Sequence, residues 1–275
     1  MTMVTNETVN NWVREMAEMT KPDEVVWIDG SKEQLEEIRK VALKTSEMIA
    51  LNEEKLPGCL YYRTNPKDVA RDEKRTLICT RKEEDAGPTN HWMAPVEMNA
   101  KLRKLFDGSM KGRVMYAIPF SMGVVGTDFA KYGVELTDSI YVVLSMAIMT
   151  RVGQPIIDKL NAGADFTKCL HSKAQVNEKE KYIVHFPEDN TIWSINSAYG
   201  GNVLLGKKCL ALRIGSFLGR KEGWMAEHML ILKIEAPDGE KHYVCGAFPS
   251  ACGKTNLAML TPPDYFKKLG YKIQT

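Results

Sequence analysis

The stretch Phe248-Pro249-Ser250-Ala251-Cys252-Gly253-Lys254-Thr255-Asn256 joins an apolar run to a segment typical of a helix. Gly-Lys-Thr at such a junction suits phosphate binding, because glycine lets the backbone approach the phosphate oxygens and the first helical amides point at the anion. We expect Lys254 to neutralise the β- and γ-phosphates and the Thr255 hydroxyl to reach a nucleotide-bound divalent ion. The general pattern asks for a glycine where this chain has Phe248. A surface loop that happens to contain Gly-Lys-Thr is the alternative interpretation.

The segments around this loop predict a β-hairpin and a helix. His228–Glu235 and His242–Phe248 are dense apolar runs, and the turn sequence Pro237-Asp238-Gly239 lies between them. We expect a helix to begin within Thr255–Leu260. The segment Tyr271–Thr275 has the character of the start of another strand.

Upstream of the hairpin, strands and helices are mixed without strict alternation, which predicts a mixed-sheet α/β fold. Apolar residues recur at helical spacing over residues 9–19, and Ser31 with Gln34 forms the capping-box pattern of a second helix. Leu204–Leu218 also suits a helix, whereas Leu56–Arg75 is rich in turn residues and predicts a loop. The expected strands are Val25–Ile28, Thr76–Thr80, Val114–Phe120, Tyr141–Met149, Lys181–Phe186 and Thr191–Ile195.

The composition limits the classes of partner. The chain has 44% apolar and 26% charged residues and a net charge of +2, so it predicts a globular protein without the strong field of a nucleic-acid or membrane binder. No signal peptide is visible at the polar start, and no run approaches about 18 apolar residues. The cysteines form no Cys-x-x-Cys pair, which argues against a cysteine zinc site and favours reduced thiols in the cytoplasm.

The loop and several other blocks resemble one enzyme family. Phe248–Asn256, with a cysteine inside the loop, closely resembles the nucleotide loop of GTP-dependent phosphoenolpyruvate carboxykinases. The resemblance runs from about residue 20 onward, with the family's blocks in the same order. The other blocks are Val69–Arg71, Met115–Gly123, Ser197–Cys209 and Glu222–Leu230.

The resemblance implies a fold and a reaction. We expect a mixed-sheet N-terminal substrate-binding domain over residues 1–224 and the beginning of a P-loop nucleotide-binding domain over residues 225–275. The family is a class of lyases that convert oxaloacetate and GTP to phosphoenolpyruvate, carbon dioxide and GDP, in gluconeogenesis or anaplerotic carbon exchange. It also implies a monomer.

The resemblance assigns the metal site to Lys208 and His228, as ligands of an active-site Mn²⁺. Only a neutral amine can ligate, so a nearby cation and partial burial would have to lower the pKa of the lysine. Lys207 is adjacent, but the spacing after Gly-Gly-Asn favours Lys208. Without the resemblance, the two lysines are typical of a solvated helix face and His228 of a structural residue at a strand end.

The resemblance also assigns the substrate and nucleotide contacts. Arg71 would hold the substrate carboxylate as a bidentate fork, with Tyr199, Gly200, Gly201 and Ser250 as further substrate-binding residues. The nucleotide, with Mg²⁺ or Mn²⁺, would lie on Ala251, Cys252, Gly253, Lys254, Thr255 and Asn256.

Lys208 and Cys252 are the catalytic residues that the resemblance implies. A thiolate at a helix N-terminus is stabilised, so we expect Cys252 to react with alkylating agents. The reaction needs no covalent cysteine intermediate, so its role would be loop mobility.

The family's third metal ligand, an aspartate in a Gly-Asp-Asp-like segment, and its guanine pocket are not found in this sequence. We therefore expect the chain to be the N-terminal part of the enzyme and inactive alone. The alternative is a non-catalytic module that binds anions or nucleotides.

Overall fold

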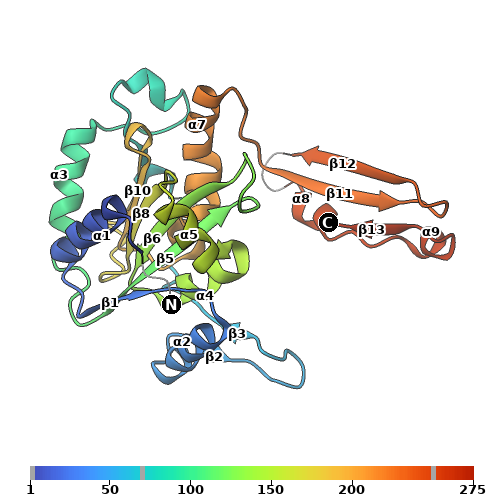
Figure 1. Cartoon of the computed structure of the whole chain (residues 1–275), viewed down its shortest axis with the longest axis horizontal. Coiled ribbons are helices and arrows are strands. Elements are labelled where there is room, and N and C mark those ends of the chain that lie inside the picture. The colour runs from blue at the N-terminus through green and yellow to red at the C-terminus, as the bar shows by residue number, and fades with distance from the viewer. Residues whose placement is uncertain (1–3, 69–71, 249–251) are drawn as a thin grey trace. The chain divides into compact units, whose positions relative to one another are not determined.

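The computed structural model describes residues 4–68, 72–248 and 252–275 (Figure 1). It divides into two compact units, Met1–Phe217 and Leu218–Thr275. Each unit is described by itself below.

The first unit is built on an eight-stranded mixed sheet in the order β1-β5-β6-β8-β10-β9-β4, with β7 paired to β5. Pairs β1–β5, β6–β8, β8–β10 and β4–β9 are parallel, whereas β5–β6, β9–β10 and β5–β7 are antiparallel. This confirms the predicted mixed-sheet α/β class. The strands are β1 (Glu24–Trp27), β4 (Thr76–Ile78), β5 (Val114–Met122), β6 (Lys131–Thr137), β7 (Arg151–Val152), β8 (Thr167–Ser172), β9 (Tyr182–Phe186) and β10 (Thr191–Ile195). A two-stranded sheet of β2 (Ile49–Ala50) and β3 (Leu60–Tyr61) lies apart from it.

One face of the sheet carries the main apolar core. Helices α1 (Glu7–Thr20), α3 (Pro95–Phe106) and α5 (Gln154–Asn161) contribute to it, and α1 contacts α3 (Figure 1). In α1 the buried positions Val9, Trp12, Val13 and Met16 follow the helical spacing that predicted this helix. From the strands, residues such as Val134 and Leu170 join the same cluster.

The opposite face carries buried polar residues. They are neighbours in sequence of the core residues, because successive side chains of a strand alternate between faces. Glu135, His171 and Ser194 are all fully buried, and each is hydrogen-bonded to the segment from Ser197 to Leu205. That segment runs through the short helix α6 (Gly200–Val203) into a π-helix at Gly206–Ile214 and then α7 (Gly215–Glu222). The helix predicted over Leu204–Leu218 is therefore present, and its first part is wound as a π-helix.

The predicted strand Tyr141–Met149 is wrong, because this segment is the helix α4 (Ile140–Met149). A continuous apolar run has no period, so it does not separate a buried strand from a buried helix. The helix start is stabilised from afar by Glu47, whose Oε1 accepts hydrogen bonds from Ser139 Oγ at 3.1 Å and from the Tyr141 amide at 3.2 Å. A carboxylate at a helix N-terminus is favourable.

The second helix, α2 (Lys32–Lys44), has half of its predicted capping box. Ser31 Oγ accepts the Gln34 amide at 3.2 Å, but Gln34 Oε1 accepts the Asp29 amide at 2.8 Å instead of that of Ser31. Short 3-10 turns complete the first unit at Glu73–Arg75, Glu83–Ala86 and Pro187–Asp189.

The second unit is a three-stranded sheet in the order β12-β11-β13, with two short helices. Strands β11 (Met229–Glu235) and β12 (Lys241–Ala247) form the predicted antiparallel hairpin, and β13 (Lys272–Gln274) pairs with the other side of β11. Helices α8 (Lys254–Ala258) and α9 (Asp264–Lys268) connect β12 to β13. Nowhere in the described parts of either unit is a helix long and apolar enough to span a membrane.

Candidate functional site

The predicted substrate turn follows β10 and leads into α6. Tyr199 is the residue before the helix and is 37% exposed, while Ser197 and Ala198 are buried. A Cβ atom at position 200 would lie 2.4 Å from the hydroxyl oxygen of Tyr141. Glycine at this position is therefore explained by the close approach of the tyrosine.

The side chain of Asp68 holds this turn by binding the turn's backbone amides. Its Oδ2 accepts hydrogen bonds from the amides of Ala198 at 2.7 Å and Tyr199 at 3.1 Å, and its Oδ1 accepts the Ser197 hydroxyl at 2.8 Å. Lys181, only 1% exposed, lies 3.4 Å from Asp68 Oδ1. A buried carboxylate is stable when hydrogen-bonded and paired in this way.

A cavity of about 510 Å³ adjoins the turn. It is lined by Tyr199, Gly200 and Gly201, which were predicted from one motif, and by the nearby Lys207. Arg63 lines it as well. The carboxylate of Asp68 is already committed to the turn and to Lys181, so the side chains left to meet a ligand favour an anion.

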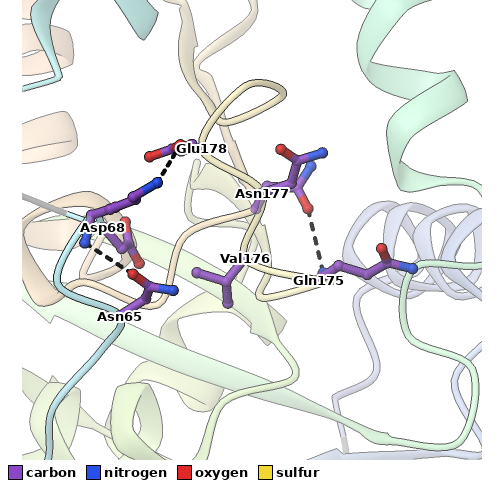
Figure 2. Close-up of a pocket in the computed structure, with 8 residues that line it drawn as sticks. Asn65, Asp68, Gln175, Val176, Asn177 and Glu178 are labelled. Carbon is purple, nitrogen blue, oxygen red and sulfur yellow. Dashed lines mark hydrogen bonds and ion pairs between the residues drawn. The ribbon is translucent and has the colours of Figure 1, made fainter.

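A second cavity, of about 370 Å³, shares the lining residues Asn65 and Asp68 with the first and is mostly polar. Figure 2 shows Asn65, Gln175, Val176, Asn177 and Glu178 around it. Val176 has a φ of 51°, an unusual left-handed conformation for a β-branched residue. No predicted site residue lines this cavity among the residues the structure describes.

Lys207 and Lys208 lie at the start of the π-helix, a winding that is frequent at functional sites. Glu135 Oε2 accepts the Leu205 amide at 3.3 Å just before this helix. Glu135 is fully buried, its Oε1 has no hydrogen-bond partner among the described residues, and burial raises the pKa of its carboxyl well above the ordinary value. Burial therefore favours the protonated acid next to the backbone that leads into the π-helix.

The phosphate loop belongs to the second unit. Gly253 has a φ of 92° and is the residue before α8, so glycine is needed here for its conformation. Lys254 Nζ donates to the carbonyls of His228 at 2.5 Å and of Phe248 at 3.0 Å. The lysine thus ties the loop to the strand ends, and His228 and Lys254 are brought together.

Several predicted residues are exposed or lie outside the described residues. Cys252, Gly253, Thr255, Asn256 and His228 are exposed. Arg71, Ser250 and Ala251 lie outside the described residues.

The predicted metal ligands are divided between the units, with Lys208 in the first and His228 in the second. Within the described part of the chain, no group of three or more His, Cys, Asp or Glu side chains could hold a metal ion. An imidazole and a neutral amine are nitrogen donors that suit a transition metal, but they supply only part of a coordination shell.

Two family models match the chain. The phosphoenolpyruvate carboxykinase N-terminal domain matches residues 11–220, and the phosphoenolpyruvate carboxykinase C-terminal P-loop domain matches residues 224–275. The chain belongs to the phosphoenolpyruvate carboxykinase family. This confirms the resemblance and the expected combination of an N-terminal carboxykinase domain with the start of a P-loop domain.

Curated relatives of the carboxykinase family agree with these matches. The chain is 55% identical over 264 residues to "Phosphoenolpyruvate carboxykinase [GTP]" of Anaeromyxobacter dehalogenans (strain 2CP-C), which covers 96% of this chain and 44% of the relative. It is 51% identical over 268 residues to the protein of the same name from Corynebacterium jeikeium (strain K411), covering 94% and 44%. The chain therefore spans less than half the length of these relatives.

Proposed function

We propose that the chain provides the substrate turn and the phosphate loop of a GTP-dependent phosphoenolpyruvate carboxykinase. The observation that carries this proposal is the cavity at which Tyr199, Gly200 and Gly201 meet the cationic side chains of Arg63 and Lys207. A small carboxylate such as oxaloacetate or phosphoenolpyruvate is the ligand whose charge suits these cations. The division into domains at residues 224 and 225 belongs to the same proposal.

The proposed reaction needs alignment of two ligands. The bond between oxaloacetate and its departing carboxylate breaks, and the electron pair becomes an enolate. The enolate oxygen then bonds the γ-phosphorus of GTP while the bond to the bridging oxygen of GDP breaks. The chain's part is to fix the carboxylate at the Tyr199 turn, aided by Arg71 and Ser250, and the phosphates at the Ala251–Asn256 loop.

Lys254 is the phosphate-binding cation of this proposal. Its ammonium already donates to carbonyl oxygens of Phe248 and His228, so exchange for phosphate oxygens keeps the same donors occupied. Thr255 would contact the Mg²⁺ or Mn²⁺ carried with GTP. Cys252 would act through the mobility of its loop.

Lys208 and His228 are proposed as ligands of an active-site Mn²⁺. When bound, the ion would stabilise the negative charge of the enolate oxygen. The lysine would have to lose its proton to ligate, and the charge of the bound ion would be what favours the neutral amine. The same proposal includes a monomer, as in the family, and a location in the cytoplasm, which the unpaired cysteines favour.

The proposal is tested by ligand binding and turnover of the purified chain. We expect phosphoenolpyruvate and GDP, with Mn²⁺, to bind measurably in calorimetry. His228→Ala should weaken Mn²⁺ binding. His242→Ala, a change at another exposed histidine of the second unit, should leave Mn²⁺ binding intact. We expect no phosphoenolpyruvate to form from oxaloacetate and GTP, since the chain spans 44% of its relatives' length. Failure of both ligands to bind would refute the assignment, and turnover would refute the expected inactivity.

A further inference from the structure

The backbone of the Tyr199 turn is held by side chains from distant parts of the first unit. Besides the amides that Asp68 accepts, the carbonyl of Ser197 accepts a hydrogen bond from His171 Nε2 at 2.8 Å. The carbonyl of Ala198 accepts one from the Tyr62 hydroxyl at 3.0 Å. Successive polar groups of the turn are thus satisfied by side chains instead of by a helix or sheet ladder.

His171 is fixed in one tautomer. Because a carbonyl oxygen can only accept, Nε2 carries the proton, and Nδ1 accepts from the Thr137 hydroxyl at 2.7 Å. The Thr137 oxygen in turn accepts the Ser139 amide at 3.1 Å. Burial lowers the pKa of His171, which favours the neutral ring of this arrangement.

Tyr62 is fixed by its ring. It stacks on Tyr141 with the ring centroids 4.0 Å apart and the planes 6° from parallel. The hydroxyl of Tyr141 is the atom that approaches Gly200. The stacked pair therefore bounds the turn at Ala198 and at Gly200, and both tyrosines line the cavity of about 510 Å³.

Asp68 is fixed by a buried cation. Lys181 bridges Asp68 at 3.4 Å and Asp72 at 3.1 Å and is 1% exposed. The aspartates come from the two sides of residues 69–71, so the same lysine secures the chain on both sides of that segment. Both oxygens of Asp68 are thus occupied, Oδ1 by Ser197 and Lys181 and Oδ2 by the turn amides, which fixes the orientation of the carboxylate.

We propose that Tyr62, Asp68 and His171 are positioning residues that hold the Tyr199 turn in the shape that receives a small carboxylate ligand. This inference rests on the proposed function. A turn with adjacent glycines is free to take many conformations, and a ligand that had to order it would bind more weakly. Groups fixed before binding remove that cost.

The first test replaces Tyr62 and measures affinity for phosphoenolpyruvate. Tyr62→Phe removes the hydrogen bond to Ala198 and keeps the stacked ring. We expect the affinity of the full chain to fall about fivefold, the loss typical of one hydrogen bond, and the melting temperature to fall by only about 2–4 °C. The matched control is Tyr61→Phe, at an exposed tyrosine. Equal affinities of Tyr62→Phe and the wild type would overturn the positioning role and leave the proposed function intact.

The second test reads the turn without a ligand. Amide hydrogen exchange of Ala198 and Tyr199 should be at least about tenfold faster in Asp68→Asn, while amides of β6 keep their rates. Asp128→Asn, at an exposed aspartate, is the control. If the wild type does not bind phosphoenolpyruvate, the proposed function fails, and the exchange rates still decide whether the turn is held. Unchanged exchange of these amides, or uniform acceleration throughout the unit, would overturn the inference.

Discussion

The substrate turn and the phosphate loop are built in opposite ways. Ser197 and Ala198 of the turn are buried, and side chains of Tyr62, Asp68 and His171 hold them. In the loop, residues 252, 253, 255 and 256 are exposed, and no residue of α8 is buried. Local sequence reveals the loop, whereas the turn depends on contacts between residues far apart in the chain.

This difference predicts different responses to mutation. The turn should be shaped before its ligand arrives, so changes around it alter both folding and binding. The loop is held to the sheet by Lys254, so changes there should alter nucleotide binding more than the stability of the first unit.

The largest expected effect comes from Lys254→Ala. Loss of a charge-assisted contact to phosphate should weaken GDP binding about 10- to 100-fold, because hydrogen bonds to charged groups contribute about 1.5–3 kcal/mol. Lys267→Ala, at an exposed lysine of α9, should leave GDP affinity within about twofold. Calorimetric titration with GDP and Mn²⁺ checks both variants, and a Lys254→Ala protein that binds GDP normally would exclude this loop as the phosphate site.

An intermediate effect is expected from Gly200→Ala. The new Cβ would lie 2.4 Å from the Tyr141 hydroxyl, and such overpacking costs about 1–3 kcal/mol of unfolding free energy. Tyr141→Phe removes the oxygen that clashes, so the double variant should recover much of the loss. Urea unfolding of the wild type, both single variants and the double variant gives the coupling free energy between positions 141 and 200 directly. Additive losses would show that the tyrosine is not the reason for glycine here.

Much of the fold could be predicted where a local signal exists. Neighbouring residues carry the signal in three places: the helical period of α1, the two apolar runs on either side of a turn in the β11–β12 hairpin, and the Gly-Lys-Thr start of α8. The helix α4 could not be predicted because its apolar run has no period and its N-terminal carboxylate, Glu47, lies far back in the chain.

The candidate site divides in the same way. Tyr199, Gly200, Gly201 and the phosphate loop were found from motifs, but Asp68 and Tyr62 have no motif that marks them. Asp68 stands among charged residues that resemble a surface segment, and only the fold brings it to the amides of Ala198 and Tyr199. Glu135 was missed for the same reason, since its burial depends on the sheet.

The smallest expected effect concerns Glu135 and is a change with pH. Burial raises the folded-state pKa of this carboxyl, so the protonated acid is favoured in the folded chain. Its contribution to stability is complete below the unfolded pKa, about 4.3, and is lost as pH rises toward the folded value. Glu135→Gln has no proton to lose there, and its amide oxygen can still accept the Leu205 amide. The variant should therefore match the wild type near pH 4 and melt a few degrees higher near pH 8. Thermal unfolding at both pH values measures the difference, and a gap that is the same at both would show that Glu135 does not titrate with folding. Glu135 contacts the backbone just before Lys207 and Lys208. The same comparison therefore shows whether a neutral acceptor stabilises the start of the π-helix better than an ionised one.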